Sequence, residues 1–317
     1  MSTTLIPIAA PADRPPPRPG SGRRPGGLRR RRALTGLAYA SPTAALVAVF
    51  FLLPIGLVGW MSLHRWPLLG QPEFNAPANY TAVPGDDLVR GAARFTVAYT
   101  VLMTAILVVV AVGLALLVQQ RRRGVGFFRT AFLLPMAVGF ATASLLFLGM
   151  LSDEIGPVTR ALAALGIVDG YVSWTSGSAT SASASAVVLV VWRFAGFTML
   201  IVLTGLQAIP TDLYEAARLD GAGPWQTFRR ITLPLLRRTL ALVLTLTITG
   251  SLLAFDQFWI LTRGGPDNST TSLVMVLYRK AFIELDLGSA AAVSVLLLLV
   301  LVAVNVVQLG ALRGRSR

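Results

Sequence analysis

The sequence predicts an all-α integral membrane protein with six transmembrane helices and with both termini in the cytoplasm. Hydrophobic residues make up 54% of the 317 residues and charged residues only 13%, whereas a soluble domain carries about a quarter charged residues. The apolar residues gather into six runs, each long enough to cross the roughly 30 Å hydrocarbon core of a bilayer. The arginines concentrate on one side of these runs. Together these observations disfavour a soluble domain.

The six predicted spans form one transmembrane domain over residues 34–311. They cover residues 37–60, 95–118, 130–151, 186–209, 239–261 and 287–309. At a rise of 1.5 Å per residue, about 20 residues make one crossing, so each run can span the membrane with some tilt. The first run exceeds the apolar segment of a signal peptide, which is about 7–15 residues long. We therefore expect it to remain as a transmembrane helix.

The arginines orient the chain. Residues 1–33 form a Pro/Arg/Gly tail that cannot bury apolar area, and we expect it to be disordered. Twenty of the 28 Lys and Arg residues lie in this tail, in segments 119–129 and 210–238, and in the basic C-terminal tail, 312–317. Because cytoplasmic loops carry the basic excess, these parts are expected inside a bacterial cytoplasmic membrane. The net charge of +14 therefore serves topology and lipid headgroups, and no nucleic-acid partner is expected.

Segment 210–238 is longer than a connection between two spans requires. Asp212 followed by Glu215 resembles a capping box at a helix start. Gly221 suits the position just after a helix, where a positive φ is often needed, and Pro224 suits the first residue of a second helix. The pattern predicts a short cytoplasmic helix, a glycine turn and a second short helix.

Two roles for this segment follow from its residue types. The small pair Ala216-Ala217 permits close approach of another surface, and Glu215 with several arginines supplies charges for a docking partner. Alternatively, the arginines bind lipid phosphates at the membrane surface. Pro234 is expected to interrupt the second helix before the fifth span.

A resemblance to a known family decides between these roles. The stretch Glu215-Ala216-Ala217-Arg218-Leu219-Asp220-Gly221, followed by Ile231-Thr232-Leu233-Pro234, resembles the E-A-A…G…I-x-L-P loop of binding-protein-dependent ABC importer permeases. Residues 192–236 and the stretch Phe255-Asp256-Gln257 are similar to the sugar-importing, maltose/glycerol-phosphate-type branch. The resemblance covers about 37–311 and implies the bundle of a type I ABC importer permease.

The resemblance also implies partners. Two ATP-binding cassette ATPase subunits would dock on the cytoplasmic loop, and a second permease subunit, expected to be a different chain, would complete the pair. An external solute-binding protein, expected to be a lipoprotein, would deliver the cargo. The docking surface would consist of Glu215, Ala216, Ala217, Asp220 and Gly221, with Ile231, Leu233 and Pro234 fixing the loop against the bundle. ATP and Mg²⁺ would belong to the ATPase, because this chain has no GxxxxGK[ST] loop and is expected to bind no cofactor.

Five residues are candidates for the cargo path. Arg193 lies inside the fourth span, where a charge costs ~2.5–3.5 kcal/mol and usually faces a bundle interior or a water-filled path. Asp256 lies near the outer end of the fifth span, and Trp192, Phe255 and Gln257 flank these two charges. Aromatic faces beside charged donors suit sugar recognition, but they also suit an interfacial aromatic belt. Arg193 also fits a structural ion pair, or snorkelling to the interface.

Other function classes find less support in the sequence. His64 is the only histidine and there is no cysteine, so neither a metal site nor a catalytic residue is predicted. A secondary transporter would show internal repeats and intramembrane carboxylates, and a membrane enzyme would need a cluster of catalytic groups. We expect a permease for a sugar or a related polar solute, with a non-sugar ABC permease and an ion-coupled transporter as alternatives.

Overall fold

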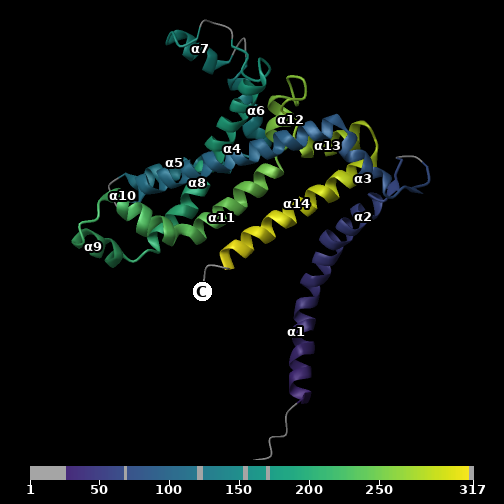
Figure 1. Ribbon diagram of the computed structural model, residues 1–317, viewed down its shortest axis with the longest axis horizontal. Helices are drawn as coiled ribbons and strands as arrows, with labels where there is room; N and C mark the ends of the chain where they lie inside the picture. Colours follow the sequence, from purple (N-terminus) through teal and green to yellow (C-terminus); the bar gives the residue numbers. More distant parts are fainter. Residues whose placement is uncertain (1–25, 68–69, 120–123, 153–155, 169–171, 314–317) are drawn as a thin grey trace, which may run out of the picture. The chain divides into compact units, whose positions relative to one another are not determined.

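The computed structural model describes residues 26–67, 70–119, 124–152, 156–168 and 172–313 (Figure 1). Its contacts divide the chain into two units, residues 1–55 and 56–317. The first unit contains α1 (Gly26–Val47), the π turn η1 (Ala48–Leu52) and the start of α2 (Leu53–Met61). The tail, residues 1–33, was predicted to be disordered. Residues 1–25 lie outside the described residues. Residues 26–33 form part of α1, so the prediction is wrong for them.

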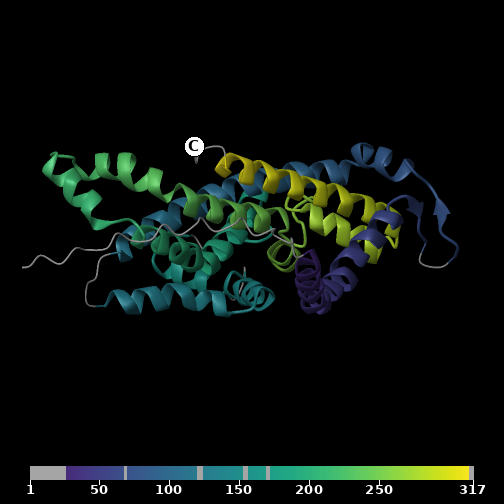
Figure 2. The same ribbon diagram turned by 90° about the horizontal axis from the view of Figure 1, so that it is seen from below.

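Four long helices build the second unit: α4 (Asp87–Val118), α8 (Ala179–Gln207), α11 (Leu233–Leu252) and α14 (Leu287–Arg313). In the chain, α4 packs against α8 and α11, and α11 packs against α14, so the three helices α4, α11 and α14 run side by side (Figures 1 and 2). Five helices in the described residues are long and apolar enough to cross a membrane. Each overlaps one of the predicted spans, which confirms the membrane fold, although several begin earlier than predicted.

The third span differs from its prediction. Residues 130–151 were expected to form one straight helix, but the chain forms α5 (Val125–Ala137) and α6 (Phe140–Met150), which meet at 97°. The backbone is extended at Val138, and Pro135 stands one turn before the break. Proline has no N–H to donate to a carbonyl of the preceding turn. The helix therefore ends within one turn of Pro135, although the run of apolar residues continues beyond it. Counted as one bent span, the pair brings the total to six.

The fifth span is also shifted. The prediction of 239–261 is wrong at its outer end, because α11 stops at Leu252 and the separate helix α12 (Asp256–Leu261) follows. At its inner end the helix begins earlier, through α10 (Pro224–Thr227) and the π turn η3 (Phe228–Thr232). Pro234 does not interrupt it, contrary to expectation. The preceding π turn closes with a bond from Leu233 N–H to Phe228 O, so the helix passes the proline with a local widening.

The short elements lie at opposite ends of the second unit. The strands β1 (His64–Arg65) and β2 (Glu73–Phe74) pair antiparallel, with His64 opposite Phe74. They precede α3 (Ala78–Ala82) and the 3₁₀ turn η2 (Val83–Gly85), whereas α9 (Thr211–Leu219) lies at the other end of the unit in both views (Figures 1 and 2). The remaining short elements are α7 (Pro157–Ala164), α13 (Leu273–Tyr278) and the π turn η4 (Arg279–Ile283).

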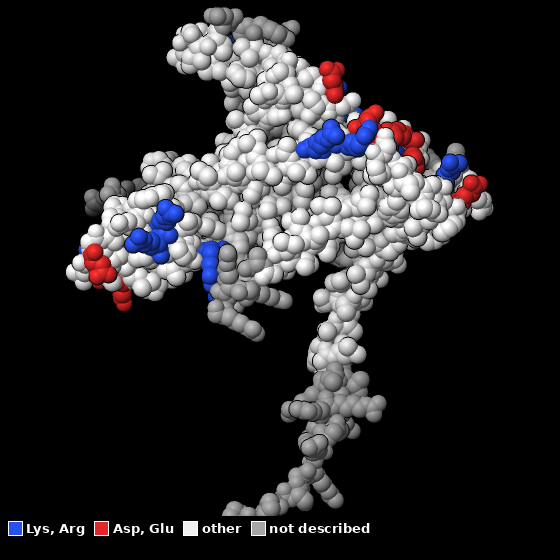
Figure 3. All heavy atoms as spheres, viewed as in Figure 1, with Lys and Arg blue, Asp and Glu red and all other residues white. Residues whose placement is uncertain are grey.

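The charged side chains also lie mainly at the two ends of the second unit. In the view of Figure 3, the charged side chains of the second unit gather towards its two ends and leave the surface between them largely uncharged. Many large apolar side chains in this region are exposed, such as Val109 at 71% and Val307 at 70%. Such a belt is stable against lipid and unstable against water. The buried cores lie beneath it, one around Tyr99, Met103 and Phe258 and one around Met199 and Leu236.

Candidate functional site

Helix α9 opens the cytoplasmic segment 210–238. It begins at Thr211, because Pro210 adopts an extended backbone with ψ of 136° and no side chain caps the first turn. The predicted Asp212–Glu215 capping box is therefore wrong: Asp212 lies inside the first turn of the helix rather than before it. There its carboxylate still favours the helix, since an anion is stabilised near a helix N-terminus.

The turn after α9 has the predicted glycine geometry. Gly221 has a φ of +73°, a conformation in which other residues are strained. Its N–H donates to Arg218 O over 3.1 Å, and the N–H of Ala222 donates to Ala217 O over 2.9 Å. This pair of bonds is the Schellman motif, which satisfies the last carbonyls of a helix. Pro224 then stands first in α10, as predicted.

The predicted docking residues divide by exposure. Glu215, Ala216, Asp220 and Gly221 are exposed, while Ala217 is buried, with 6% of its surface exposed. Apolar side chains flank the exposed group, since Leu219 is 88% exposed and Leu213 42%. The segment therefore presents a surface of small, acidic and apolar groups that suits a protein partner.

The residues expected to fix the loop lie differently. Ile231 is half-buried, and Leu233 and Pro234 are exposed. Thr232 between them is buried, with 4% of its surface exposed. Its hydroxyl and the Tyr214 hydroxyl of α9 form a hydrogen bond of 3.2 Å. Sequence reasoning missed this pair. The available signal was a threonine placed between apolar residues and a tyrosine on the inner face of the predicted helix.

A cavity of about 360 Å³ lies within the bundle. Residues of α4, α6, α8, α11 and α12, and of the break between α11 and α12, form its walls. Its lining is largely apolar and aromatic, with polar groups at a few points: Tyr99, Leu107, Phe140, Val190, Phe194, Phe197, Thr198, Leu246, Thr247, Gly250, Ser251, Leu253, Ala254, Phe255, Asp256 and Gln257. This mixture is typical of small-molecule sites.

Three of the five residues predicted for the cargo path line this cavity. Phe255, Asp256 and Gln257 stand where α11 has ended and α12 begins. Gln257 is 2% exposed, and its Nε2 donates to the Tyr99 hydroxyl over 3.2 Å. Its Oε1 is buried without a hydrogen-bond partner among the described residues. An unpaired buried acceptor is costly.

The other two candidates lie outside the cavity wall. Trp192 is 37% exposed and packs on Phe147 with ring centroids 5.4 Å apart. Arg193 donates from Nε to the carbonyl of Val138 over 3.1 Å, and its guanidinium lies 4.9 Å from the Phe140 ring centroid. It thus satisfies a carbonyl left free at the α5–α6 break. No ion pair joins Arg193 to Asp256 within the described residues, although the two charges attract through space.

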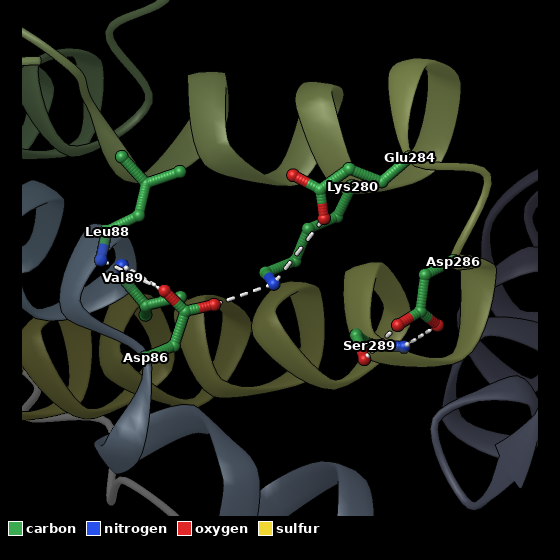
Figure 4. A network of polar contacts seen from close by, with 7 residues as sticks. All are labelled: Asp86, Leu88, Val89, Lys280, Glu284, Asp286 and Ser289. Carbon is green, nitrogen blue, oxygen red and sulfur yellow. Dashed lines mark hydrogen bonds and ion pairs between the residues drawn. The ribbon is translucent and has the colours of Figure 1, made fainter.

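An ion pair joins the residue before α4 to the π turn η4 (Figure 4). Asp86 Oδ1 caps α4 by accepting from the N–H groups of Leu88 and Val89, and its Oδ2 lies 2.7 Å from Lys280 Nζ. Burial alone would raise the pKa of Asp86, but Lys280 and the two N–H donors hold it below the ordinary 3.8. Burial alone would lower the pKa of Lys280, but Asp86 holds it above 10.5.

The chain is similar in sequence to known proteins. The family model for the binding-protein-dependent transport system inner membrane component matches residues 125–312. The trehalose/maltose transport system permease protein MalF of Thermococcus litoralis is 32% identical over 90% of this chain and 97% of its own. The sn-glycerol-3-phosphate transport system permease protein UgpA of Yersinia pestis is 34% identical over 84% of this chain and 90% of its own.

A solved structure supports the fold independently. The crystal structure of a bacterial ABC transporter involved in the import of the acidic polysaccharide alginate contains a chain with a TM-score of 0.78 to this one. The two chains are 21% identical, and the match covers 92% of this chain and 100% of the other. At this identity the likeness concerns the arrangement of the helices.

Proposed function

Since the chain belongs to the family of binding-protein-dependent transport system inner membrane components, and is therefore the multi-pass permease subunit of an ABC importer in the bacterial inner membrane, we propose that it carries a sugar or a related polar solute. It is a transport subunit rather than an enzyme. The family match over residues 125–312 includes both the cytoplasmic segment and most of the cavity wall, and the observation that carries the cargo proposal is the similarity to permeases named for trehalose, maltose and sn-glycerol 3-phosphate.

The cargo proposal rests on two kinds of support. Relatives over 80% or more of the chain are named for trehalose, maltose and sn-glycerol 3-phosphate. The cavity offers aromatic faces beside the Asp256 carboxylate and the free oxygen of Gln257. Solute hydroxyls donate to such oxygens, and sugar rings stack on aromatic faces. A volume of about 360 Å³ lies in the range of small-molecule sites.

The energy source is proposed to be a pair of ABC ATPase subunits that dock on α9 and the Gly221 turn. ATP and Mg²⁺ bind to them, and this chain holds no cofactor. A second, different permease chain completes the conduit, and an external solute-binding lipoprotein delivers the cargo at the end of the β1–β2 hairpin. Exposed Glu215, Ala216 and Leu219 supply charge, close approach and apolar area for the ATPase.

The test is ATP-dependent uptake of maltose, trehalose or sn-glycerol 3-phosphate by membrane vesicles that contain the full complex. Glu215→Arg reverses an exposed charge, and Gly221→Val places a β-branched side chain at a φ of +73°. We expect both variants to insert normally and to lose most ATPase co-purification and uptake.

Gly221→Asn is the matched control. Asparagine visits the left-handed region with little cost, and no atom lies within 4 Å of a Cβ at this position. It should therefore retain the ATPase and most of the uptake. Uptake by the Glu215→Arg variant that follows an ion gradient with no ATPase bound would overturn the proposal.

A further inference from the structure

Helix α9 is joined only lightly to the rest of the bundle. It projects at one end of the second unit (Figure 1) and packs little against other elements. Its chain connections are the Pro210 joint to α8 and the Gly221 turn to α10. A force applied to α9 by a docked partner must therefore pass through these two joints or through a side-chain contact.

The bond between Tyr214 and Thr232 is such a contact. Among the described residues, it is the one side-chain hydrogen bond that links α9 to another element. Thr232 is 4% exposed, and Tyr214 packs against the core around Met199 and Leu236. The bond is partly buried, since Tyr214 is half-buried and both side chains line an open hollow beside α10.

The position of Thr232 gives the bond its mechanical meaning. The helix from α10 into α11 has a weak point, since the π turn η3 (Phe228–Thr232) widens it and Pro234 has no N–H to give. Motion of α10 alone would be absorbed by bending there. The bond attaches α9 at Thr232, the last residue of the π turn, and so bypasses most of this weak point.

The far end of α11 lies at the cavity. Leu246, Thr247, Gly250 and Ser251 belong to this helix and line the cavity wall. Helix α11 runs without a break from Leu233 to Leu252, so a displacement at its start can be carried along its length. A displacement at Thr232 is therefore delivered to the residues that enclose the cargo.

We propose that Tyr214 and Thr232 are positioning residues that transmit the motion of the docked ATPase from α9 to α11. The inference rests on the proposed docking of the ATPase to α9. It assigns a role to two residues of the permease itself and not to the docking surface.

The experiment uses the absence of cysteine from this chain. Spin labels are attached at Leu253→Cys, at the outer end of α11 and 47% exposed, and at Val101→Cys on α4, which is 66% exposed. The complete complex, with cysteine-free partners, is reconstituted in lipid vesicles. The distance between the labels is measured without nucleotide and after trapping with ATP and vanadate, in Tyr214→Phe, Thr232→Val and the parent.

We expect the parent to change distance on trapping. In each variant, the ratio of complexes that change to complexes that do not should fall about fivefold, the effect that one neutral hydrogen bond has on an equilibrium constant. ATPase co-purification and ATP hydrolysis should persist. Combining both substitutions should add nothing further, and Thr232→Ser, which keeps the hydroxyl, should restore the change.

Thr204→Val is the matched control, because the Thr204 hydroxyl donates to Ile201 O of its own helix. It should behave as the parent. A full distance change in Tyr214→Phe and Thr232→Val would overturn the inference, and so would an equal loss in Thr204→Val. Failure of the parent to retain the ATPase would instead contradict the proposed function.

Discussion

Asp86 does two jobs at one residue. One carboxylate oxygen caps α4, and the other holds Lys280 of η4, so the start of a membrane span is tied to the turn before α14 (Figure 4). Lys280 also lies 3.8 Å from Glu284. The Lys280 side chain is 13% exposed and that of Asp86 28%. The pair is thus more shielded from water and salt than a surface ion pair.

Substituting Asp86 separates its two roles. Asp86→Asn keeps a good cap and loses the ion pair, which we expect to cost about 1 kcal/mol. Asp86→Ala loses both and should cost about 2 kcal/mol. Thermal unfolding of the purified protein in detergent measures the order of the two variants. Equal midpoints for Asp86→Asn and the parent would show that the ion pair contributes nothing.

The same variants predict a pH dependence. The pKa of Asp86 is lowered by folding, so its contribution is present above pH 3.8 and is lost as the pH falls through the folded-state value. The pKa of Lys280 is raised, so its contribution is present below pH 10.5 and is lost as the pH rises through its folded-state value. The difference between the parent and Asp86→Asn should therefore be largest between these limits and vanish beyond them. A difference that is unchanged in strong acid would contradict this.

At the scale of the elements, the bent pair α5–α6 depends on two contacts with α8. Arg193 holds the carbonyl of Val138 at the break. One turn of the helix away, Gly196 lets the backbone of α5 approach so closely that a Cβ would collide with the carbonyl of Phe132. Small residues permit such contacts between membrane helices.

Gly196→Ala should push α5 away from α8. We expect a loss of about 1–3 kcal/mol of stability, since overpacking against backbone cannot be relieved by a side-chain rotation. Gly113→Ala is the control, because Gly113 lies in α4 with no atom within 4 Å of a Cβ. Its replacement should be neutral or stabilising by up to about 1 kcal/mol. Thermal midpoints of the two proteins compare them, and equal midpoints would show that α5 gives way freely.

Local signals predicted the elements better than hydropathy predicted their ends. Gly221 and Pro224 have stereochemical requirements that hold in any context, and both were placed correctly. The bend at Val138 was not predicted, because hydropathy shows that a segment is apolar but not whether its helix is straight. Pro135 and Gly139 were the signals in the sequence that indicated a break. The contact of Arg193 with Val138 crosses 55 residues. No local pattern reports a partner so distant.

For the whole molecule, the sidedness follows from the two ends of the second unit. The β1–β2 hairpin and α9 lie at opposite ends (Figures 1 and 2), and a belt of exposed apolar side chains lies between them. Because this belt must face lipid, the two ends face different compartments. The arginine bias places α9 in the cytoplasm.

Single cysteines test this arrangement in a chain that has none of its own. The two positions are Phe74 in β2, which is 72% exposed, and Leu219 in α9, which is 88% exposed. Each is replaced by cysteine in a separate variant. In spheroplasts, a membrane-impermeant maleimide should label only Phe74→Cys. In inverted vesicles made without the ATPase it should label only Leu219→Cys. Labelling of both positions from one side would refute the topology.

The light attachment of α9 has a consequence for evolution. The helix has nine residues, and its exposed face contacts little of this chain. Substitutions on that face therefore leave the packing of the bundle undisturbed, so the proposed ATPase-docking surface can change in evolution while the cavity is retained. The reverse also holds, since the residues of the cavity can change to accept new solutes while the proposed docking surface stays the same.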